Sequence, residues 1–372
     1  MVNNIQRRKL LKSSAAVGAL ALVGSLAAPA VVRARSLKGE GEVVIYDGGG
    51  AWGEAQRIAY FEPFEKETGI RVIRNPRSDI GAVRASIAAG SPRYDATILP
   101  GGNITSFVSE GLLESIDYSL FEKTDLDAFD PIRTEEFACP HIIYSLIVAY
   151  RKSKFPNGGP KNWADLWNID GFPGRRALAS GVQHATGATF ENALLADGVR
   201  PEDLYPLDWD RAFRSLTKIK KDIFKWWFSG AESVQLLIDD QVALCSAWNG
   251  RISSAIAEGA DLEISWDQGV LQTDYWTVLK GAKNKENAMR FLAFSARADR
   301  QAEFATHILY SPPNSRAFDY ISKERAEHLP TQPAVRNLQI PQNYEFWGQK
   351  TNGISNDRYA VAQWEAWVAG LR

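Results

Sequence analysis

The sequence is poor in the residues that usually hold metal ions. It contains only 2 cysteines and 4 histidines among 372 residues, and these show none of the Cys/His spacings of a zinc site. Its net charge of -1, with both signs interspersed, argues against a nucleic-acid partner. Cys139 and Cys245 both lie in apolar runs, where free cysteine packs as a small hydrophobic residue. We therefore expect two buried thiols rather than a disulfide, no metal site and no cofactor.

Motifs for nucleotide binding and for nucleophilic hydrolysis are also missing. The glycine-rich segment from Gly48 to Gly53 lacks the third glycine of a dinucleotide-binding turn, and there is no Walker lysine. Ser180 follows Ala179 and precedes Gly181, so it does not lie in a Gly-x-Ser-x-Gly elbow. Nothing in the sequence indicates an enzyme. Because a missing motif does not exclude catalysis, a secreted hydrolase remains the alternative from a different functional class.

The first 34 residues have the order of a bacterial export signal. A basic segment with adjacent arginines, Arg7 and Arg8, precedes an apolar stretch from Ala15 to Ala27. This stretch is shorter than the ~20 residues that span a bilayer, and small-residue cleavage sites follow it at 30/31 and 34/35. The paired arginines indicate the twin-arginine route. We expect the signal to be removed and the mature protein to be soluble in the periplasm.

The remaining chain alternates between short apolar strands and amphipathic helices. The expected strands are Glu42–Tyr46, Ile70–Ile73, Tyr94–Leu99, Ile142–Tyr150, Arg176–Ser180, Gln241–Trp248, Leu262–Trp266 and Asp274–Leu279. The expected helices are Trp52–Thr68, Val83–Ala89, Ala188–Ala196, Trp209–Lys221, Asn287–Ser295 and Asp299–Thr306. This α/β alternation predicts a mostly parallel sheet with helices on both faces. Ligands of such sheets bind beyond the carboxyl ends of the strands.

Two glycine-rich turns, residues 47–50 and 100–103, follow expected strands and should lie at that edge. The first turn is either a tight connection or a close backbone approach to a ligand, with Trp52 as a wall. In the second turn, Gly102 and Asn103 are candidate ligand residues. Gln183 lies in a loop at the same edge and is a further candidate.

Several segments resemble the family 1 extracellular solute-binding proteins of ABC importers. Phe61–Val72 and Tyr94–Pro100 resemble two general segments of that family. Three further segments resemble its spermidine/putrescine-binding branch: Trp248–Gly250, Gly281–Ala288 and Tyr310–Asn314. The resemblance implies two α/β lobes around a ligand cleft, joined by strands that form a hinge. Lobe 1 would comprise residues 35–144 and 276–325, and lobe 2 residues 145–275 and 326–372.

The resemblance also implies roles for three residues. Trp248 would stack on the alkyl chain of an amine ligand, Asp274 would receive its amino group, and Tyr310 would line the pocket. A cationic amine is recognised by a desolvated carboxylate and by aromatic faces. The structural alternatives stay open at this point: Trp248 as plain core, and Asp274 as a cap or ion-pair partner near a crossing strand.

The sequence departs from the polyamine-binding pattern in two places. Residues 179–187, where that branch carries acidic side chains, contain no carboxylate, and Trp248-Asn249-Gly250 is followed by Arg251. Arginine can bind a carboxylate through two parallel hydrogen bonds, although Arg251 could instead be a solvated helix residue. One arginine and one aspartate in a cleft suit a short ω-amino acid such as γ-aminobutyrate. A diamine or polyamine, putrescine or spermidine, is the second choice, and a small carboxylate held by Arg251 alone is the third.

The expected partners follow from the resemblance. A monomer would deliver its ligand to ABC permease subunits in the inner membrane. A binder that feeds a receptor instead of a transporter is a further alternative that the sequence does not distinguish.

Overall fold

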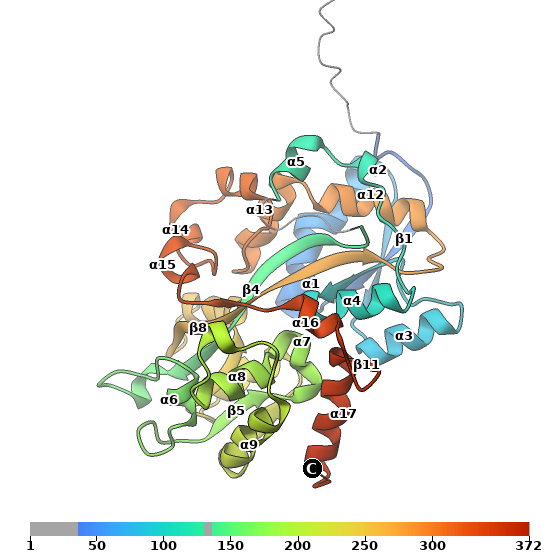
Figure 1. Ribbon diagram of the computed structural model, residues 1–372. Helices are drawn as coiled ribbons and strands as arrows, with labels where there is room; N and C mark the ends of the chain where they lie inside the picture. The colour runs from blue at the N-terminus through green and yellow to red at the C-terminus, as the bar shows by residue number, and fades with distance from the viewer. Residues whose placement is uncertain (1–35, 130–135, 372) are drawn as a thin grey trace, which may run out of the picture. The chain divides into compact units, whose positions relative to one another are not determined.

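The computed structural model describes residues 36–129 and 136–371, so the predicted export signal lies outside the described residues. Within the unit Ala34–Arg372, the described strands form a nine-stranded sheet in the order β2-β1-β3-β8-β4-β7-β5-β6, with β9 beside β8. Figure 1 shows β4 and β8 side by side in the middle of this unit. The sheet and its covering helices position the site.

The strands form where the sequence has short apolar runs. Their bounds are β1 Glu42–Asp47, β2 Arg71–Pro76, β3 Ala96–Pro100, β4 Cys139–Arg151, β5 Arg176–Ala179, β6 Ile223–Trp227, β7 Leu244–Trp248, β8 Leu262–Val278 and β9 Ile340–Pro341. A small separate hairpin consists of β10 Lys350–Thr351 and β11 Ile354–Ser355.

The helices of the first half are α1 Gly50–Gln56, α2 Glu62–Thr68, α3 Ile80–Ala88, α4 Gly101–Ser109 and α5 Lys123–Asp127. A π-helical segment, Arg57–Phe61, joins α1 to α2, so the predicted helix over Trp52–Thr68 is present with a local change of pitch. The later helices are α6 Trp163–Trp167, α7 His184–Gly187, α8 Thr189–Ala196, α9 Trp209–Ile219, α10 Gly230–Ile238, α11 Asn249–Ala257, α12 Lys285–Ser295, α13 Ala298–His307, α14 Lys323–Ala326, α15 Pro333–Arg336, α16 Tyr344–Gly348 and α17 Asn356–Val368.

The α/β prediction is confirmed, but the expectation of a mostly parallel sheet is wrong at its centre. β1 pairs in parallel with β2 and β3, and β5 with β6 and β7. The central pairs β3–β8, β8–β4 and β4–β7 are antiparallel. The reason is that β4 and β8 run through the middle of the sheet in opposite directions, whereas helix crossovers keep the outer strands parallel.

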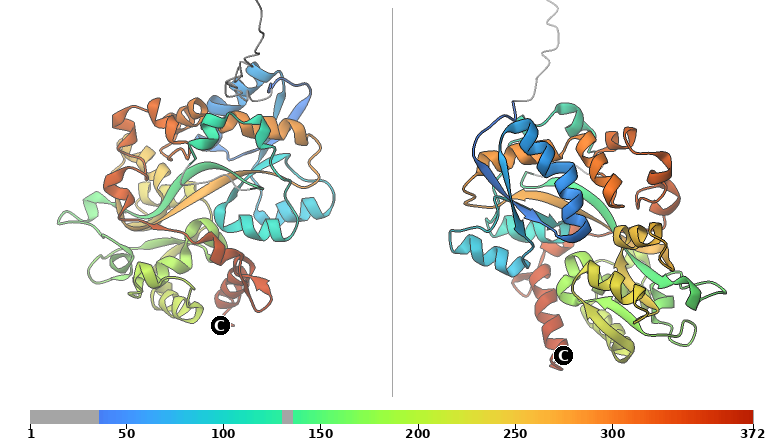
Figure 2. Two further views of the ribbon diagram at one scale, coloured as in Figure 1. Left: turned by 45° about the horizontal axis from the view of Figure 1, so that its top comes forward. Right: turned by 180° about the vertical axis from the view of Figure 1, so that it is seen from behind.

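β4 and β8 join the two halves of the sheet. They pair over most of their lengths of 13 and 17 residues, and Figure 2 shows segments that precede β4 on one side of this pair and α8 and α9 on the other. The predicted pair of strands Leu262–Trp266 and Asp274–Leu279 is one continuous strand. The polar segment around Gln268, whose φ is 59°, is accommodated because β4 and β8 change register there. The exact boundaries of the two lobes stay a prediction.

Cys139 and Cys245 are both buried free thiols, as the sequence predicts. Burial raises the pKa of each thiol, which keeps it protonated and unreactive. Among the described residues, no helix has the length and hydrophobicity needed to cross a bilayer.

Candidate ligand-binding site

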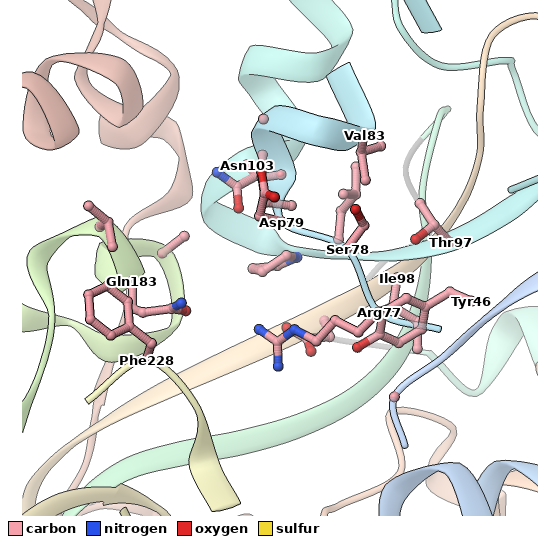
Figure 3. Close-up of a pocket in the computed structure, with 18 of the residues that line it drawn as sticks. Tyr46, Arg77, Ser78, Asp79, Val83, Thr97, Ile98, Asn103, Gln183 and Phe228 are labelled. Carbon is pink, nitrogen blue, oxygen red and sulfur yellow. The ribbon is translucent and has the colours of Figure 1, made fainter. Parts of the chain in front are cut away.

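A cavity of about 690 Å³ lies where several strands end beside the crossing pair (Figure 3). This volume is typical of a small-molecule site. Its lining comes from Tyr46, Gly48, Trp52, Arg77–Gly81, Val83, Arg84, Thr97–Pro100, Asn103, Ile142, Tyr144, Val182, Gln183, Ala185, Phe228, Trp248, Arg251, Asp274, Tyr310 and part of α17. The cavity therefore collects residues from both halves of the sheet.

Seven of the eight residues singled out from the sequence line this cavity: Trp52, Asn103, Gln183, Trp248, Arg251, Asp274 and Tyr310. Gly102 does not. It is buried, and a Cβ atom placed on it would lie 3.3 Å from the Cβ of Ala185, so this glycine serves the packing of α4 against α7. The structure brings the seven residues together, and their contacts with a ligand stay a proposal.

The Trp248-Asn249-Gly250 segment has a distinct local role for each residue. β7 ends at Trp248, whose side chain lines the cavity. Asn249 anchors the turn, since its side-chain oxygen accepts a hydrogen bond from the Ser145 backbone N–H (2.8 Å) and its amide donates to the Leu309 carbonyl (3.0 Å). A Cβ on Gly250 would lie 2.5 Å from the Tyr310 ring. Glycine there lets Tyr310 approach, and Arg251 follows in the first turn of α11.

Aromatic rings form the apolar wall of the cavity. The Trp52 and Tyr310 ring centroids are 5.5 Å apart, and Tyr310 also contacts Tyr144 at 6.0 Å. Trp248 packs edge-on against Trp227 with 5.4 Å between centroids and is only 8% exposed. Rings held in this way desolvate a ligand and can also face a cation.

Asp274 contributes a carboxyl group with one unpaired oxygen atom. It lies on β8 between Pro100 of β3 and Ile142 of β4. Its Oδ1 atom is buried and has no hydrogen-bond partner among the described residues. Burial raises the pKa of Asp274 to about 7, while the Tyr144 hydroxyl and the charge of Arg77 act in the opposite direction. A cation entering the cavity would stabilise the ionised form.

Arg251 contributes the opposite charge. Its Nε atom is buried and has no hydrogen-bond partner in the described part of the chain. No carboxylate of a described residue forms an ion pair with its guanidinium. Burial raises the pKa of the neighbouring Tyr310 to about 12, although the charge of Arg251 partly opposes this rise. The guanidinium is thus available for an anionic group in the cavity.

Asn103 lines the cavity and also belongs to a hydrogen-bond network that holds α17 in place. Its amide donates a 2.7 Å hydrogen bond to Asp357, which also accepts one from the Ser106 hydroxyl at 2.9 Å. Arg84 forms ion pairs with Asp357 (3.3 Å) and with Glu110 (3.2 Å). These charges compensate one another within the protein, so Asn103 has a structural role in addition to its place on the cavity wall.

Among the lining residues that sequence reasoning missed, Arg77 and Tyr144 bear most directly on the charges of this cavity. Arg77 follows β2, so the strand-end rule that singled out the turns after β1 and β3 could have found it. Tyr144 lies within an apolar run that indicates only a buried strand. Figure 3 shows Arg77 extending across the cavity toward Gln183 and Phe228, with Tyr46 beside it. No group of three or more metal-ligating side chains occurs in the residues described.

The family model for bacterial extracellular solute-binding proteins matches residues 59–331. The chain belongs to this family. The resemblance predicted from the sequence segments is therefore confirmed, and the solute-binding protein has the two-lobed fold of its structural neighbours.

Two relatives are similar to the solute-binding protein over most of its length. It is 34% identical to a γ-aminobutyric acid-binding protein of Pseudomonas aeruginosa over 327 residues, which are 86% of this chain and 89% of the relative. It is 25% identical to the spermidine/putrescine-binding periplasmic protein of Salmonella typhimurium over 77% of this chain and 83% of that one.

Solved structures agree with this placement. An ABC transporter substrate-binding protein of Bradyrhizobium japonicum is 36% identical, with a TM-score of 0.79, over 88% of this chain and 99% of that chain. A GABA receptor structure is 33% identical, with a TM-score of 0.77, over 88% and 97% of the two chains. The solute-binding protein is the substrate-binding component of an ABC transporter.

Proposed function

We propose that the protein binds a short ω-amino acid such as γ-aminobutyrate and delivers it, as a monomer, to ABC permease subunits in the inner membrane. The observation that carries this proposal is the pair Asp274 and Arg251. These side chains have opposite charges, face one cavity and form no ion pair with each other or with other described residues. Relatives named for γ-aminobutyrate support the same ligand class.

In the proposed complex the ligand ammonium lies against Asp274, close to Tyr144. The ligand carboxylate meets Arg251, and the aromatic wall of Trp52, Trp248 and Tyr310 covers the methylene chain. Removing water from both ends strengthens the two charge-assisted hydrogen bonds. The relatives are binding proteins of transport systems, which supports binding without turnover and weighs against a hydrolase.

A polyamine is the second candidate, because one relative is named for spermidine and putrescine. The charges of the cavity disfavour it. The sequence of the segment 179–187 contains no carboxylate for a second ammonium. Arg251 lies in the cavity instead. A small carboxylate without an amine is the third candidate, but it would leave Asp274 buried without a cation.

A melting-temperature screen tests the ligand class. At a ligand concentration a hundredfold above Kd, binding stabilises the folded state by about 2.7 kcal/mol. We expect γ-aminobutyrate to raise the melting temperature accordingly. Butyrate and butylamine each lack one charged end, and putrescine has a second ammonium in place of the carboxylate, so each should raise it much less. Mass spectrometry of the recovered ligand should show it unchanged. An equal shift with butyrate would contradict a role for Asp274, and a changed ligand would indicate an enzyme.

We also propose periplasmic localisation through the twin-arginine route, on the evidence of Arg7 and Arg8 before an apolar stretch. The double variant Arg7→Lys, Arg8→Lys should leave precursor in the cytoplasm, because this route reads the arginine pair. Cell fractionation with immunoblotting measures the distribution. Normal periplasmic accumulation of the variant would exclude this route while leaving export by another route open.

A further inference from the structure

Arg77 is a second cation at the cavity, and it comes from the opposite half of the sheet to Arg251. It lies in the short connection between β2 and α3, and its side chain is exposed to the cavity. Figure 3 shows its guanidinium extending toward Gln183 and Phe228. Within the described ranges, no carboxylate forms an ion pair with it. The guanidinium therefore lines the cavity without an ion-pair partner among the described residues.

Several other charged groups of the cavity have partners within the protein. Asp79, two residues after Arg77, caps α3 and accepts a 2.8 Å hydrogen bond from the Ala82 N–H. Arg84 and Asp357 pair with each other, and Arg358 lies 3.9 Å from Glu110. Arg77, Arg251 and Asp274 line the cavity and form no ion pair among the described residues. The same holds for the carboxylates of Asp79 and of Glu365 on α17.

The electrostatic influence of Arg77 reaches the binding residues. Its charge acts on Asp274 and on the Tyr46 hydroxyl, and the charge of Arg251 acts on that same hydroxyl. Both guanidiniums therefore lie within electrostatic reach of Tyr46 at one cavity, and Arg77 also lies within reach of the carboxylate that would receive the ligand ammonium.

We propose that Arg77 is a specificity-determining residue, which favours a carboxylate at the far end of the ligand and rejects a second ammonium there. This inference rests on the proposed binding of an ω-amino acid. With the ligand ammonium at Asp274, the other end of the ligand lies between Arg251 and Arg77. A carboxylate is attracted by both guanidiniums, whereas the second ammonium of a diamine is repelled by both.

The variants Arg77→Gln and Arg77→Lys test this role, because both keep a long polar side chain and only lysine keeps the charge. Isothermal titration with γ-aminobutyrate and with putrescine gives the ratio of the two affinities. For Arg77→Gln we expect the ratio to shift toward putrescine by about tenfold at low salt, the effect of one unscreened charge near a ligand end. For Arg77→Lys we expect a ratio close to that of the wild type.

Salt dependence separates an electrostatic role from a structural one. Arg77 is exposed, so its effect should shrink when salt is raised from about 0.01 to 0.5 M, because screening shortens the reach of exposed charges. Arg71→Gln is the matched control, since Arg71 lies on β2, the strand that precedes Arg77, is 68% exposed and pairs with Glu42 outside the cavity. This control should leave the ratio unchanged.

The outcomes distinguish the two proposals. Suppose that the wild type binds γ-aminobutyrate. If Arg77→Gln then keeps the wild-type affinity ratio, or if Arg77→Lys changes the ratio as much as Arg77→Gln does, the proposal for the Arg77 charge is wrong and the proposed function stands. If the wild type binds putrescine but not γ-aminobutyrate, or neither compound, both proposals are wrong. The inference is supported if Arg77→Gln shifts the affinity ratio about tenfold, if Arg77→Lys does not shift it, and if high salt reduces the shift.

Discussion

Arg251→Ala should abolish binding of γ-aminobutyrate and leave putrescine binding unchanged or stronger. Truncating one partner of a buried charge pair costs on the order of 2 to 5 kcal/mol, since the ligand carboxylate would be left buried without a counter-charge. A diamine has no carboxylate and loses nothing. Its second ammonium would even escape repulsion by the guanidinium. Calorimetric titration of both compounds into wild-type and variant protein measures the difference.

Trp248→Ala is the control for this experiment. It removes an aromatic face that covers the methylene chain common to both ligands, so it should weaken both and leave their ratio unchanged. If Arg251→Ala still binds γ-aminobutyrate with wild-type affinity, Arg251 does not bind the ligand carboxylate. A wild type that binds putrescine tightly and ignores γ-aminobutyrate would return the protein to the polyamine-binding branch.

The affinity for an ω-amino acid should fall as the pH drops below about 7. The pKa of Asp274 is raised to about 7 by burial, whereas an ω-amino acid keeps its carboxylate and ammonium ionised from about pH 5.5 to 8. At pH 6 the ammonium must displace the proton of Asp274, so the affinity falls about tenfold per pH unit below the pKa and binding releases a proton. Calorimetry in two buffers with different ionisation enthalpies measures this release.

Asp274→Asn provides the control. It should lose most of the affinity, and what remains should not change between pH 5.5 and 8. The unliganded variant should also melt higher than the unliganded wild type at pH 8. The pKa of Asp274 is about 7 in the folded protein and about 3.9 in the unfolded chain. The neutral carboxyl therefore contributes its full stability below about pH 3.9, and this contribution is lost as the pH rises through about 7. Identical melting temperatures across this range, or affinity independent of pH in the wild type, would contradict the assignment.

Local patterns determined much of the fold in advance. The apolar β-branched runs that became β1 and β4 have little alternative to burial in a sheet. The segment Trp52–Thr68 is helical as predicted, and both cysteines are buried because their neighbours are apolar. The order of the elements was therefore readable, as were the strand ends where a ligand would bind.

The direction and continuity of the central strands were not readable. β8 crosses the polar segment around Gln268 without ending, because β4 lies beside it along most of its length. Register and direction depend on a partner that is more than a hundred residues away in the sequence, and periodicity carries no such information. The same limit applies to Gly102, whose packing against Ala185 could not be seen from a glycine-rich turn.

For the site, the sequence by itself determined the chemical types: the aromatic residue and the arginine around Asn249, and an aspartate on a crossing strand. Only the tertiary structure decided which charges remain uncompensated. Asn103 and Arg84 are held by Asp357 from α17, whereas Asp274, Arg251 and Arg77 face the cavity. Whether a charge finds a partner depends on segments brought together from across the chain. The pairing of charges is therefore a property of the fold and not of any local pattern.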